Sequence, residues 1–269
     1  MAIDALAQIH PKAQVHASAT IHAFTTIGEH VVVGPNCEIG PHAHVVGRTT
    51  LAEGVRIFPF ASVGEVPPDL KFSGEPATVE IGARSVVREN ATITIGTAHG
   101  IMKTVVGSDC LIMSYCHVGH DSVVGNGVIM ANGAQLGGHV EVADGAILGA
   151  LSGVHQFCRI GTRAMLAGGA KVTQDVPPWT MAHGDRARLV GLNVERMRRE
   201  GLDETIKRSI KRAFRYACRQ GMTPEETSKK LEEAGLATLN SQDFLDFITA
   251  STRSTLFFGP LTVTVTHSS

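Results

Sequence analysis

The sequence is poor in aromatic residues, carries almost no net charge and has no long apolar run. Because only 5% of its 269 residues are aromatic while 43% are hydrophobic, the core must consist of Val, Ile, Leu and Ala, interspersed with 29 glycines. Such a composition suits a repetitive fold of thin coils better than a compact globule. No segment approaches the roughly 18 consecutive apolar residues that a membrane span needs, and the N-terminus lacks the order of a signal peptide. We therefore expect a cytoplasmic protein with no stable membrane insertion.

Although the net charge is only −1, the charges are unevenly distributed along the chain. Residues 186–219 contain 11 Lys and Arg against four Asp and Glu, so this segment carries +7 and the remainder −8. A local cationic field favours an anionic partner such as a nucleotide or an acidic protein, and we expect no nucleic acid. A solvated helix face would explain the same charges equally well.

Aliphatic residues recur at every sixth position through most of the first 172 residues. The repeat runs for ten hexads, resumes in phase for three more after an interruption, and continues for twelve after a shift of one residue. The aliphatic positions are Ile9, Val15, Ile21, Ile27, Val33, Ile39, Val45, Leu51, Ile57, Val63, Ile81, Val87, Ile93, Val106, Ile112, Val118, Val124, Met130, Leu136, Val142, Leu148, Val154, Ile160, Leu166 and Val172. A period of six matches neither an α-helix nor a half-buried strand, so it indicates a repeat architecture.

A small or β-branched residue lies four positions after each aliphatic residue, beginning with Ala13 after Ile9. The two positions together describe a narrow interior, with one aliphatic side chain per flat face and one small side chain near each corner. Four of the five cysteines occupy the small position: Cys37, Cys110, Cys116 and Cys158. We interpret these four as corner fillers rather than nucleophiles. An odd number of cysteines without a CxxC pair fits a reducing compartment and supplies no zinc framework.

Hexads of this type resemble those of the left-handed parallel β-helix, in which three hexads form one triangular coil of 18 residues. The 25 hexads would then form about eight coils, stacked roughly 4.8 Å apart like the strands of any sheet. The predicted fold is mainly β, with a left-handed parallel β-helix over residues 1–186. Because open ends and flat faces must be covered or paired, the resemblance implies a homotrimer packed face to face.

Two stretches interrupt the hexads. Residues 64–80 place Asp69 and Glu75 where aliphatic residues would be due, so this segment should loop out of the coils. A shorter excursion at 97–104 accounts for the one-residue shift. Loops that leave a rigid scaffold often carry binding residues.

The period changes to a helical one beyond the last hexads. Thr223, Pro224 and Glu226 form a helix start signal, in which Thr caps the helix and Glu reaches back to it. We predict an α-helical C-terminal domain over residues 187–253. The tail, residues 254–269, alternates in character, and this pattern does not predict whether it is ordered.

Thirteen histidines are too many for all of them to be catalytic. His10, His16 and His22 share the second position of successive hexads, which suggests a ladder along one edge of the stack. We interpret this ladder as solvated, since nothing supplies a converging fourth metal ligand.

A second group of histidines is more informative. With an 18-residue coil, His117, His120, His139 and His155 fall in a short column on one outer corner, on adjacent coils. His120 and Asp121 occupy turn positions that should face outward. An imidazole beside a carboxylate, with further imidazoles and backbone N–H groups nearby, is suited to general-base activation of a hydroxyl. Polar decoration of a corner is the alternative interpretation.

Six motifs, in order along the chain, closely resemble the UDP-N-acetylglucosamine 3-O-acyltransferase family of lipid A biosynthesis. They are GEVPPDLKFSGEP at 64–76, HVGHD at 117–121, LGGHVEV at 136–142, GVHQF at 153–157, QDVPPW at 174–179 and GLNVE at 191–195. The likeness extends from about residue 8 to residue 253. Hexads alone would indicate only the superfamily, whereas HVGHD, HQF and DVPP in this order are specific to the family.

The resemblance implies transfer of an (R)-3-hydroxyacyl chain from acyl carrier protein to the 3-hydroxyl of UDP-N-acetylglucosamine, the first step of lipid A biosynthesis. His120 would be the general base, Asp121 would orient and charge-stabilise its imidazole, and the backbone N–H of Gly138 would face the oxyanion. Because acyl carrier protein brings the acyl-phosphopantetheine as a substrate, the resemblance implies no cofactor and no metal.

The resemblance also assigns substrate-binding residues, placed between two subunits. The sugar and pantetheine site would be lined by Asp69, Lys71, His117, His139, His155 and Gln156. The UDP-sugar nucleotide would be held by Asn193, Glu195 and Arg199. Gly168 matches the position that measures acyl-chain length, and a small residue there implies room for a longer chain.

Two residues depart from the family pattern. Pro68 stands where many relatives have Gln, and Glu200 stands where a second Arg often follows Arg199. Pro has no side-chain donor and Glu would repel a diphosphate, so both departures bear on the nucleotide and sugar contacts.

Three other interpretations of the sequence are open. One is another hexapeptide-repeat acyltransferase, acting on a UDP-diamino sugar or using acetyl-CoA. The second is a zinc carbonic anhydrase on the same coil, which needs three imidazoles around one metal, with His117 and His120 available. The third is a non-catalytic trimeric scaffold, which leaves the HVGHD cluster without a role.

Overall fold

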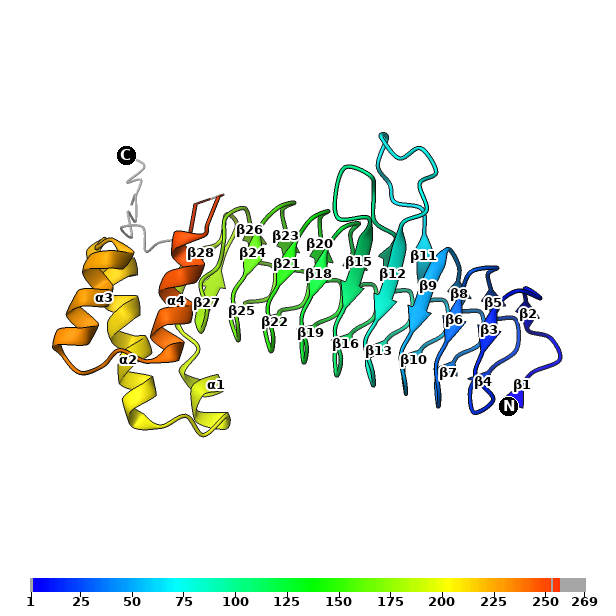
Figure 1. Ribbon diagram of the computed structural model, residues 1–269, viewed down its shortest axis with the longest axis horizontal. Helices are drawn as coiled ribbons and strands as arrows, with labels where there is room; N and C mark the ends of the chain where they lie inside the picture. The colour runs from blue at the N-terminus through cyan, green and yellow to red at the C-terminus, as the bar shows by residue number, and fades with distance from the viewer. Residues whose placement is uncertain (1, 253, 257–269) are drawn as a thin grey trace, which may run out of the picture.

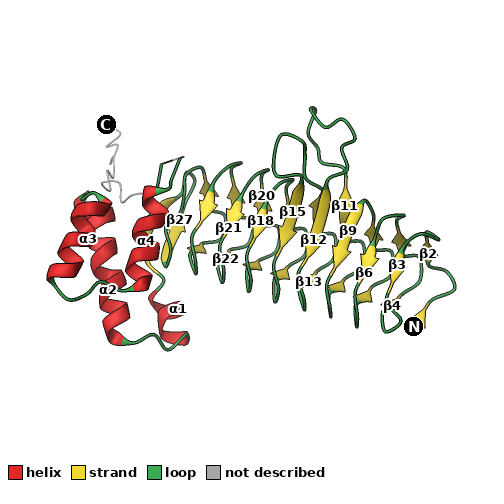
Figure 2. Ribbon diagram, viewed as in Figure 1, coloured by secondary structure: helices red, strands yellow, loops and turns green. Residues whose placement is uncertain are grey.

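The computed structural model describes residues 2–252 and 254–256, which form an elongated three-sided prism with helices gathered at one end (Figures 1 and 2). Most strands are only two residues long, and they form three largely parallel sheets that are the sides of the prism. From β1 to β27, consecutive strands belong to different sheets, so that a strand pairs with the strand one coil later. The fold is the left-handed parallel β-helix of hexapeptide repeats that the sequence predicts.

The three sheets differ in length. The first sheet contains β1 (Ala2–Ile3), β4 (Thr20–Ile21), β7 (Glu38–Ile39), β10 (Arg56–Ile57), β13 (Val86–Val87), β16 (Leu111–Ile112), β19 (Ile129–Met130), β22 (Ile147–Leu148), β25 (Met165–Leu166), β27 (Thr180–His183) and β28 (Arg188–Leu192). The second sheet contains β2 (Gln8–Ile9), β5 (Thr26–Ile27), β8 (His44–Val45), β11 (Ser62–Glu65), β14 (Thr92–Thr94), β17 (His117–Val118), β20 (Gln135–Leu136), β23 (Gly153–Val154) and β26 (Lys171–Val172). The third sheet contains β3 (Gln14–Val15), β6 (Val32–Val33), β9 (Arg48–Leu51), β12 (Thr78–Ile81), β15 (Lys103–Val106), β18 (Val123–Val124), β21 (Glu141–Val142) and β24 (Arg159–Ile160).

The hexads set the register of the sheets. Val118 pairs with Leu136 and Leu136 with Val154, so an uninterrupted coil contains 18 residues. The aliphatic residue of each hexad points inward, and from the second coil onward these side chains are buried in one continuous core. The one-residue shift appears where Ile81 pairs with Val106, since that coil also contains an excursion.

The corner cysteines are buried, as the small position of the hexad requires. All five cysteines are free thiols. Burial raises the pKa of the Cys110 thiol, and it raises the pKa of the Cys116 thiol to about 11. The Cys110 thiol donates a hydrogen bond to the carbonyl oxygen of Gly125 at 3.0 Å. A protonated thiol in the core is a filler rather than a nucleophile.

The predicted histidine ladder near the N-terminus is wrong, because residues six apart lie on different sides of the prism. His10 follows β2, His16 follows β3 and His22 follows β4, and these strands belong to the second, third and first sheets. Only residues one full coil apart form a column.

Both excursions leave the prism at the corner between the second and third sheets. The first, residues 66–77, connects β11 to β12, and the second, residues 95–102, connects β14 to β15. The hexads are interrupted over the longer range 64–80 because β11 and β12 extend beyond two residues. The two excursions project side by side from one edge of the prism (Figure 1), which we call the loop-bearing corner.

The helical end begins later than the sequence predicts. Residues 188–192, expected in the helical domain, form β28, which pairs antiparallel with β27 and closes the first sheet. The helices are α1 (Val194–Arg199), α2 (Glu204–Phe214), the π-helical η1 (Arg215–Arg219), α3 (Pro224–Glu233) and α4 (Leu239–Thr249). Thr223 and Glu226 form the predicted capping box at the start of α3.

The helices are attached to the last coils of the prism. The Arg159 guanidinium donates to the carbonyl oxygen of Phe247 at 2.6 Å, and the Leu256 N–H donates to that of Asp175 at 2.8 Å. The rest of the tail, residues 257–269, lies outside the described residues. Within the described part of the chain, no helix is long and apolar enough to cross a bilayer.

Candidate active site

A column of three residues runs along the loop-bearing corner. Asp121, His139 and Phe157 each adopt a positive φ, of 59°, 60° and 64°, at the same turn of successive coils. The N–H of His139 donates to the carbonyl oxygen of His120, and the N–H of Phe157 donates to that of Gly138. The His139 and Phe157 rings stack with their centroids 4.4 Å apart. The hexad repeat therefore aligns side chains from distant parts of the sequence.

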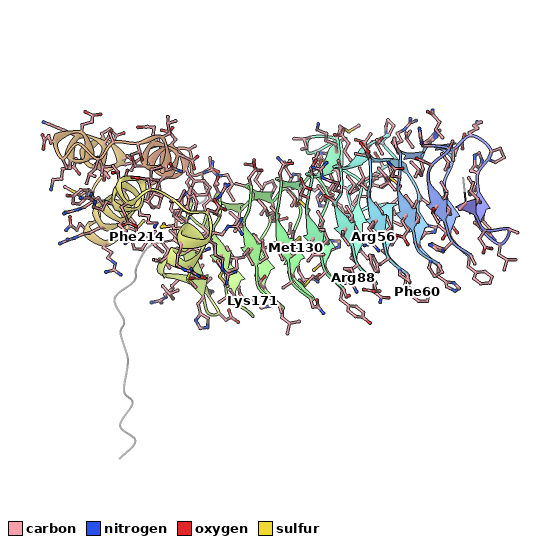
Figure 3. The ribbon with its side chains drawn as sticks, turned by 90° about the horizontal axis from the view of Figure 1, so that it is seen from below. Arg56, Phe60, Arg88, Met130, Lys171 and Phe214 are labelled. Atoms are coloured by element: carbon pink, nitrogen blue, oxygen red, sulfur yellow. The ribbon has the colours of Figure 1, made fainter. Side chains whose placement is uncertain are left out.

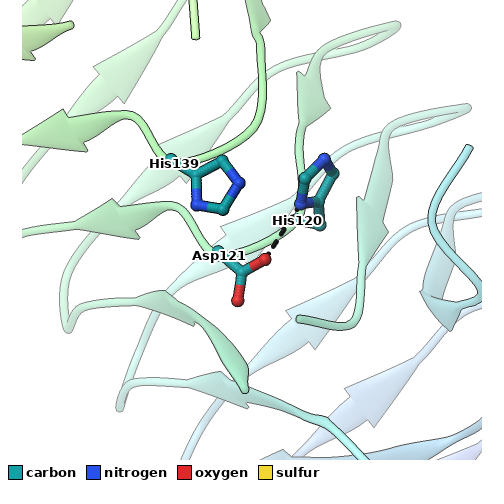
Figure 4. Close-up of side chains that lie close together, drawn as sticks. All are labelled: His120, Asp121 and His139. Atoms are coloured by element: carbon teal, nitrogen blue, oxygen red, sulfur yellow. Dashed lines mark hydrogen bonds and ion pairs between the residues drawn. The ribbon is translucent and has the colours of Figure 1, made fainter. Parts of the chain in front are cut away.

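His120 lies one residue before this column and pairs with Asp121. Its Nδ1 lies 2.9 Å from Asp121 Oδ2 (Figure 4), and its ring meets that of His139 edge to face at 4.9 Å. The side chain of Asp121 is fully buried, while that of His120 is 15% exposed. Because an ionised carboxylate can only accept, Nδ1 carries the proton and Nε2 is left as a basic acceptor.

Asp121 does not face outward, contrary to the sequence-based expectation. The second excursion folds over it, so that the N–H of Thr97 and the N–H of Ile101 donate to Oδ1 at 3.1 and 2.9 Å. The Thr97 hydroxyl donates to Oδ2 at 2.7 Å. Burial opposes the negative charge, but the hydrogen bonds from His120 and Thr97 outweigh it and hold the pKa of the Asp121 carboxyl below its usual value. The carboxylate is therefore ionised at neutral pH.

The glycine at position 138 allows the His120 ring to lie against the backbone. A Cβ atom at this position would lie 2.5 Å from His120 Nε2 and 2.6 Å from Cε1. Both distances are shorter than a Cβ atom can keep from a non-bonded neighbour. Any side chain at position 138 would displace the ring. The backbone of Gly138 is thus adjacent to the basic nitrogen, where an oxyanion donor is needed.

Two further imidazoles border the pair and are kept neutral. Burial lowers the pKa of His117, and His120 adds to the effect. Burial also lowers the pKa of His139, although the charge of Asp121 opposes the shift. His117 Nδ1 hydrogen-bonds the Thr92 hydroxyl at 2.7 Å on the outer face of the second sheet. A neutral imidazole can both donate and accept, which suits the binding of sugar hydroxyls.

The first excursion brings Asp69 and Lys71 towards the same corner. Asp69 is close enough to His139 for its charge to oppose, slightly, the lowering of that histidine's pKa, and it accepts a hydrogen bond from the Lys71 N–H at 3.0 Å. His155 and Gln156 immediately precede Phe157 on the third coil of the column, and His155 Nδ1 lies 3.0 Å from the Gln156 carbonyl oxygen. One chain therefore brings these predicted substrate-binding residues to the loop-bearing corner.

The other predicted residues lie at different corners. Asn193 is buried, caps α1, and donates to the carbonyl oxygen of Arg163 on the turn between the third and first sheets. Glu195 forms ion pairs with Arg198 and Arg199 on α1.

Gly168, the predicted ruler of acyl-chain length, lies on the turn between the first and second sheets. A single chain brings neither Gly168 nor the α1 residues to the pair of His120 and Asp121.

The departure at Glu200 has a local explanation. Its carboxylate forms ion pairs with Arg163 and Arg196. Burial opposes its charge, but hydrogen bonds from both guanidinium groups hold the pKa of the Glu200 carboxyl below its usual value. The pairing neutralises a charge that would otherwise repel a diphosphate. Pro68 is exposed in the first excursion, and nothing in the structure explains it.

His120, Asp121 and His139 also have the arrangement of a possible metal site, because their potential ligand atoms lie within 4.8 Å of one another. Both oxygens of Asp121 already accept hydrogen bonds from Thr97, and Ile101 adds another. Only two imidazoles belong to this group, which is one fewer than the zinc centre of a carbonic anhydrase needs. The donor set fits a proton-transfer pair better than a metal.

Thr97, Ile101 and Thr104 were not predicted as site residues, although all three contact Asp121. Thr97 and Ile101 contact the carboxylate, whereas Thr104 contacts the backbone: its hydroxyl accepts a hydrogen bond from the Asp121 N–H at 2.9 Å. The sequence contained information that could have identified these three residues. The second excursion follows Ile93, which pairs with Val118 of the next coil, so its loop had to lie beside His120.

Comparisons with known proteins give a consistent result. Residues 175–256 match a family model described as "Udp N-acetylglucosamine O-acyltransferase; Domain 2", and residues 6–41 and 103–138 match "Bacterial transferase hexapeptide (six repeats)". The chain is 46% identical over 189 residues to an acyl-[acyl-carrier-protein]–UDP-N-acetylglucosamine O-acyltransferase of Verminephrobacter eiseniae, covering 70% of this chain and 72% of the relative. A protein of the same name from Burkholderia lata is 42% identical over 207 residues, 76% of this chain and 79% of the relative.

The fold agrees with these sequence matches. A crystal structure of the UDP-N-acetylglucosamine acyltransferase of Francisella novicida superposes with a TM-score of 0.91 and 36% identity, covering 96% of this chain and 95% of that one. Likeness of this extent in both sequence and fold identifies the chain as a member of the acyl-[acyl-carrier-protein]–UDP-N-acetylglucosamine O-acyltransferase family.

Proposed function

We propose that this chain transfers an (R)-3-hydroxyacyl group from acyl carrier protein to the 3-hydroxyl of UDP-N-acetylglucosamine, the first step of lipid A biosynthesis. The relatives are acyl-[acyl-carrier-protein]–UDP-N-acetylglucosamine O-acyltransferases, and this activity gives the donor and the acceptor. The observation that carries the mechanism is the hydrogen bond between His120 Nδ1 and a buried, ionised Asp121, with the ring lying against Gly138.

His120 acts as the general base in this reaction. Its Nε2 takes the proton of the sugar 3-hydroxyl as that oxygen forms a bond to the thioester carbonyl carbon. The negative charge that develops on the carbonyl oxygen is met by the Gly138 N–H, a kind of contact worth about 10²–10³ in rate. When the carbon–sulfur bond breaks, the pantetheine sulfur leaves as a thiolate and takes up the proton that His120 received from the sugar. Asp121 remains ionised throughout and stabilises the imidazolium that exists between the two proton transfers.

The neighbours of the pair bind the substrates. Asp69, Lys71, His117, His139, His155 and Gln156 line the sugar and the pantetheine. Because the acyl group arrives as an activated thioester and the base is an imidazole, the reaction as proposed needs neither a resident cofactor nor a metal.

An apolar stripe on the first sheet supports a homotrimer. The outward residues of six neighbouring strands are all apolar and half-buried, and they pair in register from coil to coil: Val86, Leu111, Ile129, Ile147, Met165 and Met181. The corresponding outward positions of the second sheet include Thr92, His117 and Gln135. A continuous exposed apolar patch usually marks an interface, and three copies close such contacts around a threefold axis.

The same packing would complete the site. Because Gly168 and Asn193 lie at other corners than His120, they reach a substrate at His120 only from a neighbouring copy. In that arrangement Asn193, Glu195 and Arg199 hold the nucleotide, and Gly168 limits the length of the acyl chain. The space beside Gly168 is open, since a Cβ atom there would lie 3.4 Å from the Ala150 carbonyl oxygen, its nearest neighbour. This openness favours a longer acyl chain.

The experiment that tests the function offers the purified protein two acceptors and a series of donors. UDP-N-acetylglucosamine and a UDP-2,3-diamino sugar are each incubated with acyl carrier proteins that bear (R)-3-hydroxyacyl chains of different length. We expect an ester at the 3-oxygen of UDP-N-acetylglucosamine, identified by mass spectrometry. Transfer to the diamino sugar alone, giving an amide, would favour the N-acyltransferase alternative, and no transfer to either acceptor would refute the proposal.

The assembly is tested separately by Ile147→Arg, which places a charge in the middle of the apolar stripe. We expect sedimentation equilibrium to give the mass of a trimer for the wild type and a smaller mass for the variant. Thr50→Arg, at an exposed outward position of the third sheet, is the matched control and should remain trimeric. A monomeric wild type, or an unaffected Ile147→Arg trimer, would contradict this interface.

A further inference from the structure

The carboxylate of Asp121 is held by the second excursion as much as by His120. Its two oxygens accept hydrogen bonds from the Thr97 hydroxyl, the Thr97 N–H, the Ile101 N–H and His120 Nδ1. Three of these four donors belong to residues 95–102, which lie about one coil before Asp121 along the chain. The orientation of the carboxylate therefore depends on a loop that the hexad repeat does not specify.

Two glycines let this loop close tightly over the carboxylate. A Cβ atom at Gly100 would collide with the carboxyl group of Asp121, and one at Gly96 would lie 2.8 Å from its Oδ1. The side chain of Thr97 lies between these glycines and is fully buried. Its hydroxyl therefore has a fixed partner, at 2.7 Å, rather than water.

The loop is in turn attached to the first excursion by Glu75. One oxygen of the Glu75 carboxylate accepts the Ala98 N–H at 2.8 Å, and the other accepts the N–H and hydroxyl of Ser73. The backbone hydrogen bonds lower the pKa of Glu75 to about 2, so this attachment persists at any physiological pH. The first excursion, Thr97 and Asp121 thus form one connected network.

We propose that Thr97 is a positioning residue for catalysis, an inference that rests on the proposed acyl transfer. Its hydroxyl and His120 Nδ1 bind the same oxygen, Oδ2, from two directions. This shared contact fixes the Asp121 carboxylate in the rotamer that faces the imidazole. It also stabilises the negative charge of the carboxylate, which has no access to water. Without the hydroxyl, the buried carboxylate becomes harder to ionise and is free to turn away from His120.

The test compares Thr97→Val, which replaces the hydroxyl with a methyl group of similar size, with Thr97→Ser, which keeps the hydroxyl. For Thr97→Val we expect kcat to fall about 10- to 100-fold, the factor that corresponds to a hydrogen bond with a charged group. The KM for UDP-N-acetylglucosamine should change less than twofold. The acid limb of the kcat/KM profile should move to lower pH, because His120 must be neutral to act as the base, and a carboxylate that is less ionised or turned away stabilises its protonated form less. Thr97→Ser should restore kcat to within about threefold of the wild type.

Thr25→Val is the matched control for stability. Thr25 is also fully buried at a corner of the prism, where its hydroxyl donates to the carbonyl oxygen of Gly40 at 2.8 Å, but it has no contact with the site. Its loss should lower the thermal unfolding temperature about as much as Thr97→Val does and leave kcat and the pH profile unchanged.

The outcomes separate this inference from the function itself. An inactive wild type overturns the proposed function, whereas an active wild type with an equally active, unshifted Thr97→Val overturns only the role of Thr97. An equal loss in Thr97→Ser would show that packing of the methyl group, not the hydroxyl, matters, and would also overturn it. Thr97→Ala serves in place of Thr97→Val if the latter does not fold, with the same expected results.

Discussion

Two corners of the prism carry the same kind of ring stack, but they differ in what lies beside the rings. At the corner between the first and second sheets, which we call the bare corner, His42 stacks between Phe24 and Phe60 with centroids 4.8 and 5.0 Å away. All three have positive φ, as Asp121 and His139 do at the loop-bearing corner. Phe24 is 53% and Phe60 58% exposed, and Phe60 lies at the outer edge of the prism (Figure 3).

The difference lies in what covers each column. The hexad repeat aligns side chains at every corner, so a column of stacked rings arises wherever the turn residues are suitable. At the loop-bearing corner, the second excursion adds buried donors and encloses a carboxylate. The comparison indicates that the coils align the side chains, Asp121 included, whereas the second excursion buries the carboxylate and supplies the hydrogen bonds that hold it against His120.

The largest expected effect in this comparison of corners is that of Asp121→Asn. The amide keeps the shape of the side chain but removes the charge that stabilises the imidazolium, so we expect kcat to fall about 10²–10⁴-fold. Asp109→Asn is the matched control, since Asp109 also has positive φ but sits at an exposed corner and pairs with Arg84. Steady-state kinetics of both variants would reveal the contrast, and similar activities would argue against it.

Gly138→Ala should have the next largest effect. Because the added Cβ atom would lie 2.5 Å from His120 Nε2, the ring must move away from the backbone N–H that faces the oxyanion. We expect kcat to fall about 10²–10³-fold. Gly153→Ala is the control, because the atom nearest to a Cβ added there is 3.6 Å away. The kcat of this variant should equal that of the wild type. A fully active Gly138→Ala enzyme would contradict the close packing of base and oxyanion donor.

His139→Ala should have a smaller effect. It removes the edge-to-face contact with His120 and a neutral hydrogen-bonding group next to the sugar, but neither member of the catalytic pair. Since an aromatic pair contributes about 0.5–1.5 kcal/mol, we expect kcat/KM to fall about 2- to 12-fold. His42→Ala, in the equivalent stack of the bare corner, should not change kcat/KM. Equal losses in both variants would remove the distinction between the corners.

The smallest expected effect concerns stability against acid. The folded pKa of Asp121 lies below the unfolded value of about 3.9, so its stabilisation is fully present above that pH and is lost as the pH falls through the folded pKa. Calorimetry between pH 3 and 7 should show the wild-type unfolding temperature converging on that of Asp121→Asn, by a few degrees, at the acid end. A constant difference across this range would contradict the lowered pKa.

The fold was predictable because a period of six needs only a count of aliphatic residues. The start of α3 was predictable because Thr223, Pro224 and Glu226 act within one turn of the chain. The strand β28 was not, since residues 188–192 are extended by pairing with β27 rather than by a pattern of their own.

The candidate site was predictable only in part. His120 and Asp121 are adjacent in sequence, and a count of 18 places His139 beside them. The burial of Asp121 was missed because it depends on how residues 95–102 fold, which no repeat specifies. The positions of Gly168 and Asn193 relative to His120 depend on neighbouring copies, so a single chain does not reveal them.

The most direct measurement of the central claim is the turnover of His120→Ala with UDP-N-acetylglucosamine and an (R)-3-hydroxyacyl-acyl carrier protein. The account predicts that transfer to the sugar falls about 10²–10⁴-fold or more, while the mass of the assembly and its thermal unfolding stay as in the wild type. Turnover close to that of the wild type would contradict the assignment of His120 as the base.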